Sequence, residues 1–206
     1  MKLDKNKILI QIGTHNGNDE FNLLVKESLP SKVILVEPNK KFNKSIIDNY
    51  KNIDNVFIEN VAITKDRVDS VTLYWTKMFD DNGVEDSGAG FTLLPMDDWG
   101  TDMYSFEADS MTFSQLCEKY SIDDIHYLQI DTEGYDVEII KSIDFSKVSI
   151  DIIKYEKWGF PEYCFTRYGE NKTLYGVNAM AYASGYLTSL GYKLIEEPYD
   201  IIAIKK

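Results

Sequence analysis

Short apolar runs alternate with amphipathic stretches along the first half of the chain. Residues 8–13 form a β-branched run that ends in glycine, and residues 33–36 form a second run that stops at Glu37-Pro38. Runs of this length and composition predict buried strands. Apolar residues at helical spacing predict a helix after each strand, through Phe21, Leu24, Val25 and Ser28 and then through Phe42, Ile46, Ile47 and Tyr50. This alternation is typical of a parallel sheet with helices on both faces.

The rest of the chain continues the alternation and closes with two strands. The pattern predicts strands over residues 55–63, 68–75, 125–130 and 150–155, helices over 112–120, 134–143 and about 177–190, and a final antiparallel hairpin formed by 192–196 and 200–205. A length of 206 residues fits a single domain, 1–206, because most domains hold about 100–200 residues. We therefore expect one α/β domain.

Two segments depart from this alternation. Residues 80–109 hold nine acidic residues and no lysine or arginine, and we expect an acidic loop that is either a lid over the site or a solvated connection. Residues 155–175 hold seven aromatic residues. Such a cluster suits stacking on the faces of a sugar acceptor, and it equally suits a small satellite core.

Charge and composition exclude several classes of protein. The net charge of −12 argues against a nucleic acid or an anionic membrane as partner, because both attract a basic surface. Cys117 and Cys164 lie outside any CxxC or Cys/His pattern, which excludes a disulfide scaffold and a zinc ribbon. No apolar run approaches the roughly 20 residues of a membrane span, and residues 1–7 lack the apolar part of a signal peptide. A cytoplasmic location is expected, and nothing in the sequence indicates the oligomeric state.

The first candidate site is the turn over residues 13–17, Gly-Thr-His-Asn-Gly, between the first strand and its helix. Glycines allow a tight turn and the close approach of a ligand, and the helix N-terminus adds a positive dipole end. The G-x-x-x-G spacing differs from the G-x-G-x-x-G dinucleotide fingerprint. Glu37 stands at the tip of the second strand, where an acid can accept both hydroxyls of a ribose, although a solvated glutamate would look the same. Turn and acid together predict a nucleoside site.

A second candidate site follows the strand over residues 125–130. Asp131 closes that strand and Glu133 comes next but one, so both lie at the carboxyl edge of the sheet, where open α/β sheets bind ligands. We expect Asp131 to contact a ligand. For Glu133 a catalytic role and the capping of the following helix remain equally open. Asp136 is interpreted as an ordinary acid in the first turn of that helix.

These motifs recur in one order along nearly the whole chain. They are Ile10-Gln11-Ile12-Gly13-Thr14-His15-Asn16-Gly17, Val36-Glu37-Pro38-Asn39, Asn60-Val61-Ala62-Ile63, Leu128-Gln129-Ile130-Asp131-Thr132-Glu133-Gly134, Tyr155-Glu156 and Leu190-Gly191-Tyr192. In this arrangement residues 8–205 resemble the FkbM family of S-adenosylmethionine-dependent methyltransferases. The resemblance implies a Rossmann-like class I methyltransferase fold: a seven-stranded, mostly parallel sheet, helices on both faces and an antiparallel last strand. Two positions depart from the family pattern. Gln11 stands where many class I methyltransferases carry an acid, and Gln129 stands where a lysine often precedes Ile-Asp.

The resemblance also implies a cofactor, S-adenosylmethionine, with S-adenosylhomocysteine as its product. Glu37 would bind the ribose, and Asn60 and Ala62 would border the adenine. The full set of implied cofactor contacts is Gly13, Thr14, His15, Asn16, Gly17, Glu37, Pro38, Asn60, Ala62 and Asp131. Asp131 and Glu133 would lie beside the transferred methyl group, with Glu156 as the reserve base; His15 fits packing or cofactor contact better than proton transfer.

We expect the methyl group to go to a hydroxyl of a small-molecule or glycan acceptor, with a sugar favoured. Three alternatives remain open at this point. The chain could be an inactive nucleoside-binding or scaffolding module of the same fold, or a nicotinamide-dependent oxidoreductase, which the missing G-x-G-x-x-G disfavours. It could also be a metal-assisted methyltransferase in which Asp131, Glu133 and Asp136 gather a divalent ion, although we predict no metal.

Overall fold

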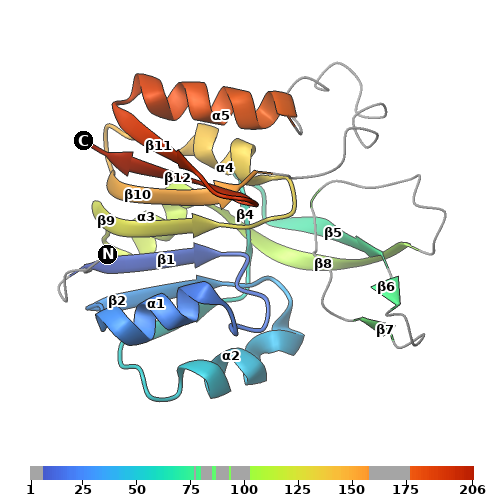
Figure 1. Cartoon of the computed structure of the whole chain (residues 1–206). Coiled ribbons are helices and arrows are strands. Elements are labelled where there is room, and N and C mark those ends of the chain that lie inside the picture. The colour runs from blue at the N-terminus through green and yellow to red at the C-terminus, as the bar shows by residue number, and fades with distance from the viewer. Residues whose placement is uncertain (1–6, 77, 80–84, 87–92, 94–102, 158–176) are drawn as a thin grey trace.

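The main sheet joins strands from both ends of the chain (Figure 1). The computed structural model describes residues 7–76, 78–79, 85–86, 93, 103–157 and 177–206. Seven strands pair in the order β11-β12-β10-β9-β1-β2-β3. Their bounds are β1 (Ile8–Ile12), β2 (Lys32–Val36), β3 (Val56–Glu59), β9 (Asp124–Ile130), β10 (Ser149–Glu156), β11 (Tyr192–Glu196) and β12 (Asp200–Lys205). β12 runs antiparallel to both of its neighbours, β10 and β11, and the other pairs in this sheet are parallel. The predicted seven-stranded sheet with an antiparallel last strand is confirmed.

The strand order reverses beside β1, and this reversal creates a crevice. After β1 the chain proceeds to β2 and β3 on one side, and it returns later to β9 on the other side. The register pairs Ile12 with both Val36 and Ile130, so β1, β2 and β9 end at the same level. In open α/β sheets ligands bind outside the carboxyl ends of the strands at such a switch point.

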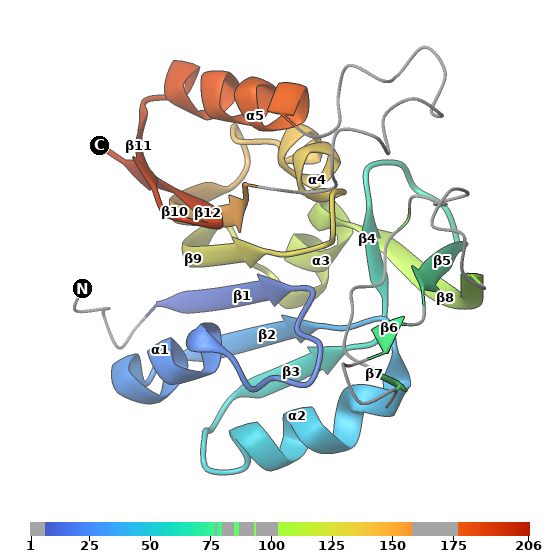
Figure 2. The same ribbon diagram turned by 45° about the vertical axis from the view of Figure 1, so that its right-hand side comes forward.

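Helices cover both faces of the sheet because its strands are apolar on both sides (Figure 2). On one face, α1 (Glu20–Ser28) and α2 (Asn43–Tyr50) pack Phe21 and Ile46 against Leu9. On the other face, α3 (Phe113–Tyr120), α4 (Asp136–Ser142) and α5 (Val177–Ser189) pack against Ile10 and Ile12. The predicted helices are confirmed. Within the described ranges, no helix is long and apolar enough to span a membrane.

Local signals set the helix ends. The side chain of Asp19 accepts a hydrogen bond from the backbone of Asn22 and caps α1, while Thr112 and Gln115 form a reciprocal capping box at α3. A one-turn 3-10 helix, η1 (Lys40–Phe42), leads into α2. These caps use the short polar residues that the sequence places between its apolar runs.

A smaller sheet lies beyond the carboxyl ends of the main strands (Figures 1 and 2). It consists of β4 (Ala62–Thr64), β5 (Ser70–Thr76) and β8 (Met103–Thr112), in the order β4-β8-β5. Ala62, Leu73 and Ala108 form an apolar cluster within this sheet. Buried Glu138 on α4 anchors this sheet through Lys65, which follows β4, with Nζ and Oε2 3.1 Å apart. The small sheet thereby forms a wall opposite the ends of β1 and β2.

The structure corrects two predictions here. The single strand expected over residues 55–63 is two strands, because Asn60 leaves the ladder: its side chain donates to the Glu37 carbonyl at 2.9 Å and pairs with Asn43 at 2.8 Å. The acidic loop expected over residues 80–109 is wrong for 103–109, which belong to β8, and for the short strand β7 (Glu85–Asp86), which pairs with β6 (Met78–Phe79).

The exposed acids Glu107 and Asp109 alternate with Phe106 and Ala108, which is the pattern of a half-buried strand. The many acidic residues of this segment obscured that pattern in the sequence. Apart from Leu93, the remainder of the acidic segment lies outside the described residues, and so do residues 158–175 of the predicted aromatic insertion. The expected lid and the expected stacking surface therefore stay predictions.

Candidate active site

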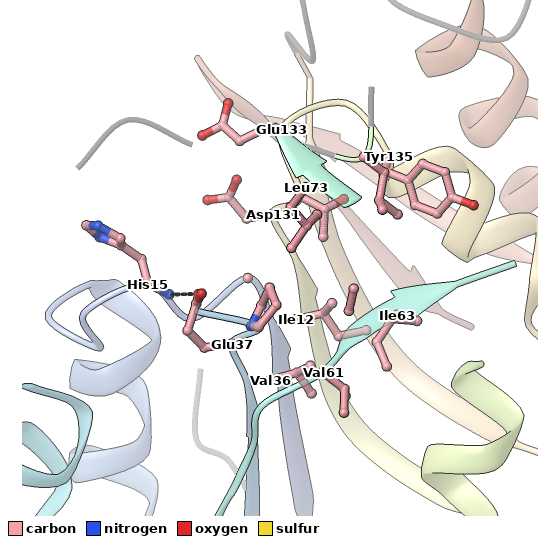
Figure 3. A pocket seen from close by; sticks show the side chains of 15 residues that line it. Ile12, His15, Val36, Glu37, Val61, Ile63, Leu73, Asp131, Glu133 and Tyr135 are labelled. Atoms are coloured by element: carbon pink, nitrogen blue, oxygen red, sulfur yellow. Dashed lines mark hydrogen bonds between the residues drawn. The ribbon is translucent and has the colours of Figure 1, made fainter. Parts of the chain in front are cut away.

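A cavity of about 220 Å³ opens at the switch point, between the main sheet and the small sheet (Figure 3). The strand ends form its floor, and β4 and β5 form its apolar wall. It is lined by Ile12, Gly13, His15, Val36, Glu37, Pro38, Val61, Ala62, Ile63, Leu73, Leu93, Asp131, Thr132, Glu133 and Tyr135. An apolar pocket with a few convergent polar groups is the usual form of a small-molecule site.

The turn after β1 is pressed against the end of β9. Gly13 has a positive φ of 87°, and a Cβ atom added to it would lie 1.7 Å from the carbonyl oxygen of Asp131. Its backbone N–H donates to the carbonyl of Val36 at 3.0 Å, so the turn is also tied to β2. Only glycine fits a backbone this close in this conformation. The turn therefore joins the three strand ends into one rigid floor.

Most of the predicted cofactor residues gather around this cavity. Six of them line it: Gly13, His15, Glu37, Pro38, Ala62 and Asp131. Thr14, Asn16 and Gly17 belong to the same turn without lining the cavity, and Asn60 braces the backbone behind Glu37. Among the predicted catalytic residues, Glu133 lines the cavity, whereas Glu156 lies in an adjacent recess beside Gly134 and Asp136.

The sequence analysis missed much of the apolar wall. Val61 and Ile63 flank the predicted Ala62 and could have been found from it. Leu73 and Leu93 reach the cavity only because the small sheet stands there, and Tyr135 contributes its ring while its hydroxyl accepts from the backbone of Lys65 at 3.3 Å. Leu73 and Leu93 carry no local motif, whereas Tyr135 directly follows the motif that ends at Gly134 and could have been found from it.

Glu37 is a buried acid at the cavity wall, only 4% exposed. Its two carboxylate oxygens accept backbone N–H groups from His15 and Asn39, both at 2.8 Å (Figure 3). Burial raises the pKa of Glu37 from its usual value to about 7, although these hydrogen bonds and the charge of Lys41 lower it. Glu37 therefore titrates near neutral pH and can still accept bonds from a ligand when ionised.

Asp131 and Glu133 project into the same space (Figure 3), where their carboxyl groups and the imidazole of His15 point to one side. Asp131 is exposed where it lines the cavity, yet the surrounding protein raises its pKa well above the usual range, and the charges of Asp136 and Glu133 add to this. Burial, then the charge of Asp136, likewise raises the pKa of Glu133. Raised carboxyl pKa values at a cavity are typical of catalytic acids and bases.

Glu133 does not occupy the cap position of α4. Its φ is 54°, in the left-handed region, and Gly134 follows with a φ of 99°. The cap position of α4 is taken by Tyr135, whose side chain makes no capping hydrogen bond. Glu133 therefore does not cap α4. Its carboxyl points into the cavity, which favours contact with a ligand.

Gln11 and Gln129, the two residues that differ from the family pattern, belong to a buried row of polar residues beneath the cavity floor. Gln11, Gln129 and Lys154 are register neighbours on β1, β9 and β10. Gln11 donates to Asp19 at 2.6 Å, which ties β1 to the start of α1. Lys154 forms ion pairs with Asp200 at 3.1 Å and with Glu20. The row fixes α1 and β12 at the edge that carries the site.

The acids do not assemble as a metal site in the part of the chain that is described, where no group of three or more His, Cys, Asp or Glu side chains is arranged to hold an ion. Asp136, a member of the metal-binding alternative, instead accepts hydrogen bonds from the backbone of Thr132 at 2.8 Å and of Glu156 at 3.0 Å. Its interpretation as an ordinary first-turn acid is wrong, since the side chain is buried and bridges two segments.

The sheet order, the glycine turn and the acid at the tip of β2 define a class I methyltransferase fold. The chain belongs to the FkbM methyltransferase family, because the family description "Methyltransferase FkbM domain" matches residues 11–194. No curated protein matches the chain.

Solved structures agree on the fold at low sequence identity. The methyltransferase FkbM from Methylobacillus flagellatus is 11% identical with a TM-score of 0.54, over 98% of this chain and 44% of that chain. An rRNA methylase from Streptococcus thermophilus is 11% identical with a TM-score of 0.50, over 98% of this chain and 89% of its own. An O-methyltransferase from Bacillus cereus, solved with S-adenosylhomocysteine, is 10% identical with a TM-score of 0.50, over 97% of this chain and 74% of its own.

Proposed function

We propose that this protein transfers the methyl group of S-adenosylmethionine to a hydroxyl of a small acceptor, with a sugar as the first candidate. The observation that carries the proposal is the pair of carboxyl groups, Asp131 and Glu133, that point into the cavity with raised pKa values. A hydroxyl must lose a proton as it is methylated. A carboxylate whose pKa is raised toward neutrality is the stronger base for that proton.

The residues along the cavity have the chemistry that the parts of the methyl donor would need. The ribose hydroxyls would donate to Glu37, and the adenine would lie against the apolar wall around Ala62 and Leu73. The methionyl end would lie over Gly13, where the absence of a side chain lets a ligand approach the backbone. The sulfonium methyl would then face Asp131.

The chain's own groups supply positioning and proton transfer. When bound, the cofactor supplies an electrophilic methyl group on a positively charged sulfur. Asp131 or Glu133 would accept the proton that the acceptor hydroxyl loses as its oxygen takes the methyl group, with the cofactor sulfur as the leaving group. Glu156 and His15 are the remaining candidate bases.

The acceptor is expected to be uncharged or cationic. The net charge of −12 and the acids around the cavity disfavour a phosphate-rich substrate. The test is a screen of glycans, free sugars and nucleotide-sugars for formation of S-adenosylhomocysteine, with the protein lacking acceptor as the blank. Turnover on RNA, or on amines but on no hydroxyl compound, would contradict the proposal.

Replacement of Glu37 by alanine should weaken cofactor binding. We expect a loss of about 1.5–3 kcal/mol, the usual worth of hydrogen bonds to a charged group, which is about 10- to 150-fold in Kd. Isothermal titration calorimetry with S-adenosylmethionine measures it. The matched control is Glu59→Gln, because Glu59 is a buried acid at the tip of the neighbouring strand that pairs with Lys119 instead. Equal cofactor affinity in wild type and Glu37→Ala would show that Glu37 does not bind the ribose.

Cofactor affinity should also rise with pH through the titration of Glu37. Only the ionised carboxylate accepts both ribose hydroxyls, so affinity should rise with pH below the Glu37 pKa of about 7 and level off above it. The rise should reach at most about tenfold per pH unit. At pH 6, calorimetry in buffers of different ionisation enthalpy should show release of about one proton per cofactor bound. Glu37→Ala should abolish this release while Asp131→Asn keeps it. If proton release persists in Glu37→Ala, the group that loses its proton on cofactor binding is not Glu37.

A further inference from the structure

Asp136 is a buried acid beside the cavity, and its side chain lines no part of that cavity. Its side chain is 3% exposed at the first residue of α4. One carboxylate oxygen accepts the backbone N–H of Thr132 at 2.8 Å and the Thr132 hydroxyl. The other oxygen accepts the backbone N–H of Glu156 at 3.0 Å. Burial raises the pKa of Asp136, while these hydrogen bonds lower it and so favour the ionised form. All three partners are donors, which is the arrangement that an ionised carboxylate requires.

The two segments that Asp136 joins both carry candidate bases. Thr132 stands between Asp131 and Glu133 in the loop after β9, and Glu156 is the last residue of β10. We propose that Asp136 is a positioning residue of the active site, whose buried carboxylate clamps these two strand ends together and holds a negative charge between their acids. This inference rests on the proposed methyl transfer to a hydroxyl.

The charge of Asp136 bears on every acid around it. The titratable groups that face it are Asp131 and Glu133 from the β9–α4 loop and Tyr155 and Glu156 from β10, with Asp200 of β12 acting on Asp131 and Glu156. Burial and then the charge of Asp136 raise the pKa of Glu156 to about 9. Lys154, the buried cation of β10, is occupied by Glu20, Glu197 and Asp200.

A division of labour follows for the acids of the site. At neutral pH Glu156 carries its proton, and one of its oxygens lies buried without a hydrogen-bond partner within the described residues. It is then a hydrogen-bond donor, and it becomes a base only above about pH 9. Asp131 and Glu133 line the cavity and Glu156 does not, so proton acceptance from a bound acceptor is assigned to Asp131 and Glu133.

The test is the titration of Glu156 by ¹³C-carboxyl NMR in wild type and in Asp136→Asn. This measurement needs neither acceptor nor turnover, so it stands or falls apart from the proposed function. We expect a wild-type midpoint near 9 that falls by about one pH unit in Asp136→Asn, because one neighbouring charge is removed. Amide exchange at Glu156 and Thr132 should also accelerate as their acceptor is weakened.

The matched control is Glu138→Gln, which removes a second buried acid from the same helix. Glu138 pairs with Lys65 and Lys141, so the Glu156 midpoint should stay at its wild-type value. An unchanged midpoint in Asp136→Asn, or an equal fall in both variants, would overturn the proposal, even if amide exchange accelerates. Should Asp136→Asn fail to fold, the wild-type titration alone decides, since a Glu156 midpoint below about 6 contradicts a retained charge at Asp136.

Discussion

Gly13→Ala is expected to abolish cofactor binding and to destabilise the whole protein. The added methyl group would lie 1.7 Å from the Asp131 carbonyl oxygen, which belongs to backbone and cannot rotate away. Alanine is also disfavoured at a φ of 87°. β1 and β9 would have to move apart to accommodate the methyl group. We expect this to lower the free energy of unfolding by about 3 kcal/mol or more. Urea unfolding measures the stability, and calorimetry with S-adenosylmethionine measures the affinity.

Gly185→Ala is the control for this prediction. Gly185 lies in α5, and nothing lies within 4 Å of a Cβ atom placed there. The same substitution should therefore raise stability by roughly 0.5–1 kcal/mol, the difference between alanine and glycine inside a helix. If Gly13→Ala binds the cofactor and unfolds like wild type, the close approach of the turn to β9 is not what the site requires.

The frame of the site could be predicted because it depends on local pattern. Short β-branched runs that alternate with amphipathic stretches specify the strands and helices of the main sheet. Parallel strands place their carboxyl ends together, so Gly13, Glu37 and Asp131, each one residue past a strand, were expected at one edge, and they line one cavity. No long-range information was needed for that step.

The apolar wall could not be predicted because it depends on pairing between distant segments. Strand β5 pairs with β8 across a register that joins Leu73 to Phe106, and the connection between them shows no periodicity. Asn60 ends a strand through contacts with Asn43 and Glu37 that arise only after β2 and β3 are aligned. Such contacts are non-local, so the sequence alone left one long strand and one long loop.

The protonation states of the acids were equally out of reach. Glu37, Asp136 and Glu156 resemble solvated acids in the sequence, yet two of them are buried and Glu156 lies among like charges. The pKa of a carboxyl depends on burial and on neighbours brought together by the fold. The site could thus be located from the sequence, whereas the roles of its acids could not be separated.

Asp131→Asn and Glu133→Gln are expected to lower turnover by about 10²–10⁴-fold on the acceptor that the screen identifies, with cofactor affinity little changed. Each amide keeps the shape of its side chain and loses proton acceptance. The fold should survive, because Asp131 is tied to the turn by backbone atoms: its N–H donates to Ile12 at 2.9 Å. Single-turnover rates with saturating cofactor separate this effect from binding.

The pH dependence and one control decide between the two carboxyls. Turnover of wild type should rise with pH through the raised pKa of the base, because only the ionised carboxylate accepts a proton. Of the two variants, the one that loses the base should lose this rise as well as the rate, while Glu27→Gln, which removes an exposed acid of α1, should keep both. We expect Asp131 to organise the transfer centre and Glu133 to contact the acceptor hydroxyl. Normal turnover in both variants would move proton acceptance to Glu156, His15 or water, and Glu156 would then require alkaline pH to act.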